Sequence, residues 1–216
     1  MSKKKIITLA LVAMIAILSI TSASLAYFTD TKTAENTFTM GNVKIVLDET
    51  DVTNPNGDRV TENEYDVYPG AVVTKDPIVH NTGKNGAYIR VLINVENWMN
   101  VCAALYPDYT ETFPNEEYKN SLLLLVDQLG DGWSIEEVTA GDVFTIGQFD
   151  AKFVLKYDGV LASGADTTAV FEHVKVPTTI TNATSDAFGA ITIVAQAIQA
   201  DGFDSWEDAF TAFDAE

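Results

Sequence analysis

The chain has 216 residues with 31 acidic and 13 basic side chains, which gives a formal net charge of −18, and it contains a single cysteine. A chain with this charge repels phosphate backbones, which excludes nucleic acid as a partner. Because one cysteine cannot form an intrachain disulfide, the stability of the fold must come from packing.

The N-terminal residues have the pattern of an export signal. Three lysines at positions 3–5 precede an apolar run over residues 6–20, and Ser24 and Ala26 place small side chains where a signal peptidase reads them. The run is shorter than the roughly 20 residues that cross a bilayer as a helix. We therefore predict a signal peptide that is cleaved between Ala26 and Tyr27. The protein would then contact the membrane only during export. An uncleaved membrane anchor is the alternative.

The segment that follows the signal, residues 27–216, has the length of one domain with a substantial core. The signal contains three of the 13 basic residues and none of the 31 acidic ones, so 10 basic and 31 acidic residues remain, a formal charge of −21. Such a charge keeps an exported protein soluble. Cys102 lies among apolar neighbours and is predicted to be buried.

Strand patterns begin at residues 36–47, where apolar and polar side chains alternate on both sides of Gly41. The next segment, residues 48–66, is rich in Asp, Glu, Asn and Thr and is predicted to be a surface loop. A polar turn separates the extended residues 67–79 from the alternating residues 89–95. This order predicts a pair of strands joined by that turn. The upper part of this second strand is apolar on both faces, as is typical of a central strand.

Residues 98–140 depart from this pattern and are predicted to be a helical and loop insertion, with a helix over about residues 116–129 that ends at Gly130. Strand patterns resume at residues 143–146, 152–157, 169–176 and 190–198, and a capping box at Ser205 starts a terminal helix. About six to eight short strands indicate a mainly β fold, an antiparallel β-sandwich with two or three short decorating helices.

Metal-binding and catalytic signatures are absent from the sequence. His80 and His173 are the only histidines, both on predicted strands and outside any His-Glu-x-x-His helix, so we expect no catalytic residue. The loop carboxylates Asp51 and Asp58 offer oxygen donors that suit calcium, but their spacing does not fit an EF-hand. We expect no cofactor, with zinc at a composite site using the histidines and carboxylates, or calcium at the loop, as the alternatives.

Several segments resemble the TasA/camelysin family of secreted proteins from Gram-positive bacteria. They are the junction Ala-Tyr-Phe-Thr-Asp-Thr-Lys at residues 26–32, residues 36–43, 68–70, 75–83 with its Asn-Thr-Gly, 87–91 and 195–203. The resemblance implies a jelly-roll sandwich, processing by a signal peptidase of the SipW type, and assembly into fibres of the extracellular biofilm matrix. The family also carries a metalloprotease label through camelysin, although the zinc signature is missing here.

The leading hypothesis is a secreted structural subunit, located in the matrix or at the cell surface, that polymerises with itself and with other matrix proteins. Residues 27–40 would be the donor strand, with Tyr27, Phe28, Phe38 and Met40 contacting a neighbouring subunit. In the alternative arrangement, this segment is an ordinary first strand of its own chain. Two other classes of function stay open: a zinc-dependent endopeptidase, and a monomeric surface or matrix binding module that uses the aromatic residues around positions 106–118.

Overall fold

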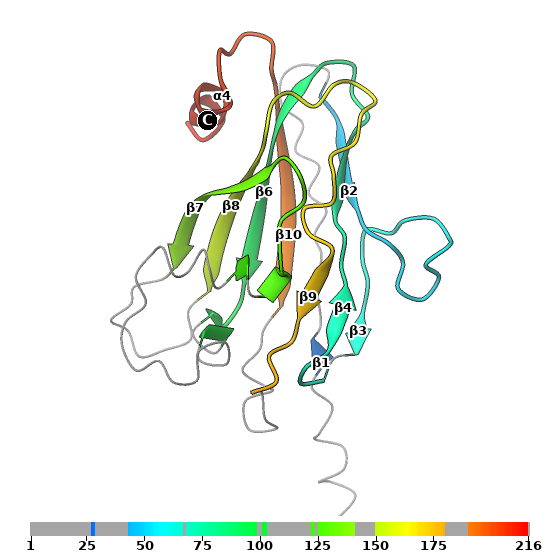
Figure 1. Ribbon diagram of the computed structural model, residues 1–216. Helices are drawn as coiled ribbons and strands as arrows, with labels where there is room; N and C mark the ends of the chain where they lie inside the picture. The colour runs from blue at the N-terminus through cyan, green and yellow to red at the C-terminus, as the bar shows by residue number, and fades with distance from the viewer. Residues whose placement is uncertain are drawn as a thin grey trace, which may run out of the picture.

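The computed structural model describes residues 27–28, 43–66, 68–98, 101–102, 122–123, 125–140, 150–179 and 190–215. The strands and the helix defined in these ranges are, in chain order, β1 (Tyr27–Phe28), β2 (Ile45–Asp48), β3 (Tyr65–Asp66), β4 (Val72–Thr74), β5 (Ile78–Asn81), β6 (Ala87–Val95), β7 (Trp133–Ala140), β8 (Ala151–Tyr157), β9 (His173–Lys175), β10 (Ile191–Gln199) and α4 (Trp206–Phe213) (Figure 1). All paired strands are antiparallel, which confirms the predicted mainly β class. The jelly-roll topology stays a prediction.

The largest sheet has four strands in the order β10-β6-β8-β7 (Figure 1). β6 is central: Ile93 lies opposite Ile193 of β10 on one side and opposite Phe153 of β8 on the other. Every second residue of β6 enters the core and is buried, as period-two geometry requires: Ala87, Ile89, Val91, Ile93 and Val95. The prediction of a central strand is therefore confirmed.

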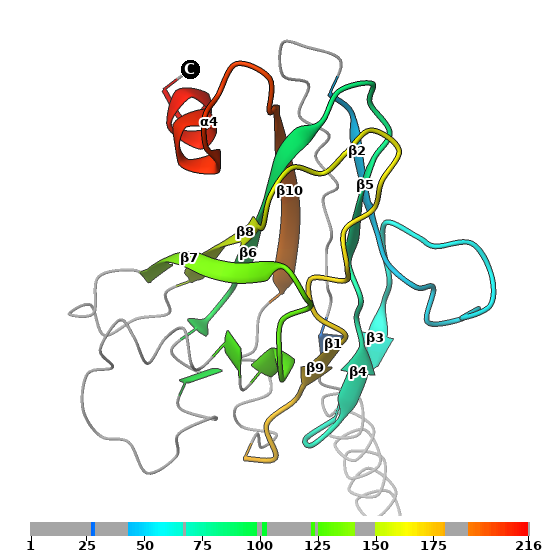
Figure 2. The same ribbon diagram turned by 45° about the horizontal axis from the view of Figure 1, so that its top comes forward.

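Three two-stranded sheets, β2–β5, β4–β9 and β1–β3, complete the described strands. Ile45 of β2, Val79 of β5 and Val174 of β9 are buried in the same apolar cluster as the inner face of the large sheet. Figure 2 shows these short sheets beside β10 and away from β7. The sheets thus cover one shared core, as expected for a layered β domain.

The polar turn over residues 81–86 does not join a strand pair, so this prediction was wrong. β5 pairs with β2, whereas β6 pairs with β10 and β8. The turn carries the chain from one sheet to another, and Val79 and Ile89 reach the common core from different sheets. Alternation identifies a strand but not its partner, which explains the error.

The segment predicted to be a helical and loop insertion contains β7, an edge strand of the large sheet. Its register with β8 shifts between Ile135 and Glu137, and such a bulge interrupts the period of two by which a strand is recognised. The predicted helix is helical at residues 122–123 and 125–126, and it stops before Asp127, whose φ of 71° is left-handed. Residues 116–121 and the predicted strand 143–146 lie outside the described residues.

The terminal helix α4 begins where the capping box predicted. The Ser205 hydroxyl accepts a hydrogen bond from the backbone N–H of Asp208 at 3.0 Å. The helix packs on the outer face of β6 and β10, where Phe210, Ala209 and Ile198 form a second buried apolar cluster. The Arg90 guanidinium lies 4.4 Å from the Phe210 ring centroid. Arg90 also donates to both carboxylate oxygens of Asp214, at 2.7 and 2.5 Å. The helix therefore covers one end of the sheet.

Three further observations concern the described residues. Cys102 is buried, as predicted from its neighbours. No helix in the described part of the chain has the length and apolar character needed to cross a membrane. The predicted strand over residues 169–176 is shorter than expected and comprises only β9, where it pairs with β4.

Replacing Phe153 by alanine tests the assignment of the inner face. Its side chain is completely buried and meets the Trp98 ring edge-on at 5.0 Å. Truncation leaves a cavity, so we expect the free energy of unfolding in urea to fall by about 3–5 kcal/mol. The matched control is Lys152→Ala, an exposed neighbour on the same strand, which should change it by less than about 0.5 kcal/mol. A loss below about 1 kcal/mol for Phe153→Ala would contradict the assignment.

Candidate functional site

The first two residues after the predicted cleavage point form a strand. β1 pairs with β3 of the same chain, with Tyr27 opposite Asp66 and Phe28 opposite Tyr65. These two strands, each two residues long, make a sheet of their own, near β4 in Figure 1. The pairing is the one expected if the N-terminal segment acts as an ordinary first strand. Of the other residues predicted for cleavage and donation, Ser24, Ala26, Phe38 and Met40 lie outside the described residues.

A buried polar cluster includes Tyr65 of β3; we call Glu49, Asn63, Tyr65 and Lys75 the Glu49 cluster. Glu49 Oε1 accepts hydrogen bonds from Asn63 Nδ2 at 2.5 Å and from the Tyr65 hydroxyl at 3.0 Å. Its other carboxylate oxygen, Oε2, accepts from Lys75 Nζ at 3.3 Å, and these two charged side chains are only 2% and 3% exposed. Buried charges are rarely found without such partners. The partner strand of β1 is therefore held by a buried polar network.

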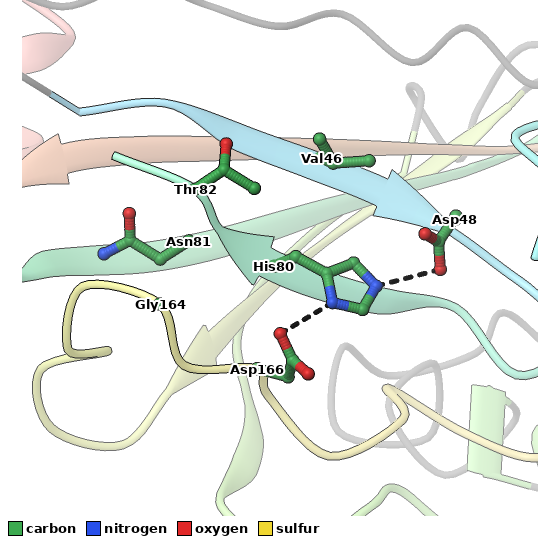
Figure 3. Close-up of a pocket in the computed structure, with 7 residues that line it drawn as sticks. All are labelled: Val46, Asp48, His80, Asn81, Thr82, Gly164 and Asp166. Carbon is green, nitrogen blue, oxygen red and sulfur yellow. Dashed lines mark hydrogen bonds and ion pairs between the residues drawn. The ribbon is translucent and has the colours of Figure 1, made fainter. Parts of the chain in front are cut away.

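The second polar site is a shallow surface pocket of about 330 Å³ between β2, β5 and the loop before β9. Figure 3 shows His80 in this pocket between two carboxylates from different parts of the chain. His80 Nε2 lies 3.0 Å from Asp48 Oδ1, and Nδ1 lies 2.7 Å from Asp166 Oδ1. The remaining lining residues are Val46, Asn81, Thr82 and Gly164. His80 thus connects Asp48 of β2 to Asp166, which follows His80 by 86 positions in the sequence.

Arg59 extends this network into the acidic loop. Its Nε donates to Asp48 Oδ1 at 2.6 Å and one terminal nitrogen donates to Asp76 Oδ2 at 2.9 Å. Asp76 also accepts from the backbone N–H and the hydroxyl of Thr50, both at 2.8 Å. Partial burial raises the pKa of Asp76, but these hydrogen bonds outweigh that effect and hold its pKa below the usual value. Asp48 and Asp76 therefore neutralise the charge of Arg59.

The pKa of His80 is shifted by opposing effects. Partial burial lowers its pKa, but the hydrogen bonds and charges of Asp48 and Asp166 outweigh burial and raise the pKa above its ordinary value. A protonated ring can donate to both carboxylates, whereas a neutral ring has one N–H and faces the second carboxylate with a lone pair. The charged form therefore fits the site best.

This shift predicts a pH dependence of stability. Because the folded-state pKa is raised, the stabilisation by His80 is complete below the unfolded value of about 6.5 and is lost as pH rises through the folded value. We expect the unfolding free energy of the wild type to exceed that of His80→Gln most at about pH 5.5, and the difference to shrink at alkaline pH. Thr82→Ser, in the same pocket but without a titrating group, is the control. A difference that grows with pH contradicts the assignment.

The Asn-Thr-Gly segment has a structural role. The Asn81 side chain is buried; its Nδ2 donates to the carbonyl oxygens of Asn85 and Leu161 at 2.9 and 3.0 Å, and its Oδ1 accepts from the Gly83 N–H at 3.0 Å. One amide thus fixes the turn between β5 and β6 and joins it to the loop around Leu161. The loop before β9 is held against the His80 pocket in this way.

The remaining predicted metal ligands do not join His80. Asp51 accepts hydrogen bonds from the backbone and hydroxyl of Thr53, both at 2.7 Å, and these bonds lower the pKa of its carboxyl. Asp58 lies on the exposed part of the same loop, and His173 lies on β9 opposite Thr74 of β4. Among the described residues, no group of three or more His, Cys, Asp or Glu side chains has an arrangement that could hold a metal ion.

The antiparallel sheets and the short paired N-terminal strand define a mainly β protein with a polar network behind the partner of its first strand. The model of a family described as camelysin metallo-endopeptidase matches residues 1–96, from the predicted signal through β6. The resemblance to the TasA/camelysin family is thereby confirmed over these residues. Comparison with curated proteins and with solved structures gave no match.

The family description implies a metal, and the described residues do not fit one. A catalytic zinc ion needs about three protein ligands converging at 2.0–2.3 Å. Both ring nitrogens of His80 already face carboxylates, Asp48 on one side and Asp166 on the other, so these donors surround the ring rather than a common point (Figure 3). The described residues around His80 therefore do not make a zinc site.

Sequence reasoning selected His80 by residue type but missed its partners Asp48 and Asp166, and it missed the Glu49 cluster. Glu49 was treated as one carboxylate of an exposed loop, whereas its side chain is 2% exposed. A buried lysine is rare, and Lys75 within the residues predicted to be extended, 67–79, was the one signal that an acidic partner should be sought.

Proposed function

We propose that the protein is a structural subunit of extracellular biofilm matrix fibres that assembles by donation of its N-terminal strand to a neighbouring subunit. The observation that carries the proposal is the β1–β3 ladder, which begins at Tyr27, the first residue after the predicted cleavage point. The match of residues 1–96 to the camelysin family supports it. Processing by a SipW-type signal peptidase and the presence of other matrix proteins in the fibre are part of the same proposal.

The physical basis is that the ladder can form within a chain or between chains with the same hydrogen bonds. A ladder of two residues is weak on its own, so exchange has a low barrier compared with a long strand. Residues 29–42 separate β1 from Val43 in the sequence, and the length of this segment limits the distance at which β1 can pair with the β3 of a neighbouring subunit. At high local concentration a neighbour's β3 competes with the chain's own, and each exchange adds one subunit to a fibre.

A second edge is poorly suited to this assembly. β7 is an edge strand of the large sheet, but it carries a bulge and the adjacent acidic residues Glu136 and Glu137. Bulges and charges are the features by which natural edge strands avoid pairing with other chains. We therefore place the addition of subunits at β3 and not at the β7 edge of the large sheet.

The proposal is tested with the chain that begins at Tyr27. We expect fibres by negative-stain electron microscopy and a rise in scattering intensity over time. In the full chain, which retains residues 1–26, we expect the strand to stay near the membrane and fibres to be absent. A chain beginning at Tyr27 that remains monomeric by light scattering over a wide range of concentration and pH would support a binding module instead.

A zinc-dependent endopeptidase is the second candidate, and the description of the matched family favours it. Because the donors around His80 do not converge, we expect the dialysed protein to carry far less than one zinc per chain and to show no casein cleavage that a chelator removes. The readouts are metal analysis and a casein assay. About one zinc per chain, with chelator-sensitive cleavage that His80→Gln abolishes, would favour the enzyme.

A further inference from the structure

The Glu49 cluster combines three groups that are seldom buried together: an amine, a carboxylate and a primary amide. Lys75, Glu49 and Asn63 are 3%, 2% and 5% exposed. The two oxygens of the Glu49 carboxylate are divided between the other two groups, with Oε2 on Lys75 Nζ at 3.3 Å and Oε1 on Asn63 Nδ2 at 2.5 Å. A single carboxylate therefore bridges an amine and an amide nitrogen.

We propose that Lys75 and Asn63 are joined by an intramolecular isopeptide bond, formed with Glu49 as the proton carrier. The Lys75 ammonium gives a proton to Glu49, and the neutral Nζ attacks Cγ of Asn63. The Nζ–Cγ bond forms, the Cγ–Nδ2 bond breaks, and Glu49 passes the proton to the departing Nδ2. The second Nζ proton leaves through Glu49, which ends as a carboxylate. The products are one amide and one ammonium ion, so atoms and charge balance without an oxidant or reductant.

The surroundings of Asn63 favour this reaction. The Asn63 carbonyl oxygen Oδ1 accepts a hydrogen bond from the Val52 backbone N–H at 3.0 Å, which is where negative charge develops when Nζ attacks. The amide orientation is fixed because Nδ2 also donates to the Thr50 carbonyl oxygen at 2.8 Å. Burial favours proton transfer from ammonium to carboxylate, since a separated ion pair is costly away from water.

Tyr65 and a neighbouring surface pocket complete the site. The Tyr65 ring lies 5.4 Å from Lys75 Nζ, and its hydroxyl donates to Glu49 at 3.0 Å, which holds the carboxylate in place. A surface pocket lined by Thr50, Val52 and Tyr65 adjoins the cluster and offers ammonia a route to solvent. The arrangement supplies a nucleophile, a proton carrier, a stabilised carbonyl oxygen and an exit.

The bond would connect the residue that follows β4 to the segment that precedes β3. The strand that pairs with β1 would then lie inside a covalent loop, in a chain whose single cysteine forbids an intrachain disulfide. Such a loop restricts the unfolded chain as a disulfide does. It would hold β3 in position while β1 is pulled or exchanged.

Mass spectrometry of the protein as cells produce it tests the bond. We expect the measured intact mass to be lower, by the mass of one ammonia, than the mass calculated from the sequence of the same chain. Trypsin should leave Lys75 uncut and release residues 60–84 as one peptide. Cleavage after Glu64, which lies between the joined residues, should leave the two pieces connected. Glu49→Gln and Lys75→Arg should each restore the full mass.

The controls separate this loss from cyclisation at an Asn-Gly sequence, which also releases ammonia. Asn56→Ser and Lys84→Arg, at exposed positions outside the cluster, should keep the lower mass and the joined pieces. Should the wild-type protein, folded by circular dichroism, have the full sequence mass and be cut completely after Lys75, the cluster is an ion pair only and the proposal is overturned. This result needs no variant, so a variant that fails to fold does not affect the test.

Discussion

Removing residues 27–35 from the chain that begins at Tyr27 is expected to abolish fibres while the remaining domain stays folded. The deletion takes away β1 and most of the segment that is proposed to enter the neighbour, so no strand is available to pair with β3. Among the residues whose burial the structure describes, the apolar cluster extends from Val43 to Ala197, so a large core remains after the deletion. The expected result is a monomer by light scattering with an unchanged circular dichroism spectrum.

A matched pair of point variants refines this prediction. Phe28→Pro removes a backbone N–H from the ladder and restricts φ, whereas Phe28→Val keeps both the N–H and a strong preference for extended structure. We expect fibre yield to fall sharply in the proline variant and to remain in the valine variant. Fibres of normal length and number after the deletion would show that growth uses another surface.

Replacing Glu49 by alanine is expected to lower the free energy of unfolding by about 3–5 kcal/mol, because it removes the carboxylate that faces the buried Lys75. The hydrogen bonds from Asn63 and the Tyr65 hydroxyl are lost at the same time. Without Glu49 the proposed bond to Asn63 cannot form, so Lys75 keeps its charge in a buried position after losing the carboxylate that faces it, which is costly. Urea unfolding followed by circular dichroism measures the change.

Two further variants distinguish burial of charge from loss of a contact. Glu64→Ala, an exposed carboxylate close in sequence, should change the unfolding free energy by less than about 0.5 kcal/mol. Glu49→Ala combined with Lys75→Met removes both charges, so the double variant should be more stable than Glu49→Ala alone. Equal losses for the single and double variants would contradict the view that the charge left on buried Lys75 causes the loss of stability in Glu49→Ala.

Much of the fold could be predicted from local patterns. Apolar residues of β6 and β10 alternate without interruption, and Ser205 with Asp208 has the capping pattern that starts α4. These signals depend on neighbouring residues alone, so they survive without knowledge of the partners. β7 has no such signal, because the bulge between Ile135 and Glu137 breaks the alternation.

The sites were less predictable because their residues are far apart in the sequence. His80 and Asp166 are 86 positions apart, and Glu49 and Lys75 are 26 apart. Composition marked residues 48–66 as an acidic loop but could not distinguish exposed Asp58 from buried Glu49. That difference depends on which side chain faces β3 and β4 once the sheets have formed.

The most direct measurement of strand donation uses cysteines at two positions that lie opposite each other in the β1–β3 ladder. One chain carries Tyr27→Cys, a second carries Asp66→Cys, and both carry Cys102→Ser; opposing residues of antiparallel strands lie about 4.5–5.5 Å apart, within disulfide range. After mixing and oxidation, we predict that fibres contain a covalent dimer of the two different chains. A third chain, which carries both Tyr27→Cys and Asp66→Cys, reports pairing within one subunit. If fibres contain no mixed dimer and only this third chain forms the disulfide, β1 stays in its own subunit, and assembly by donation is contradicted.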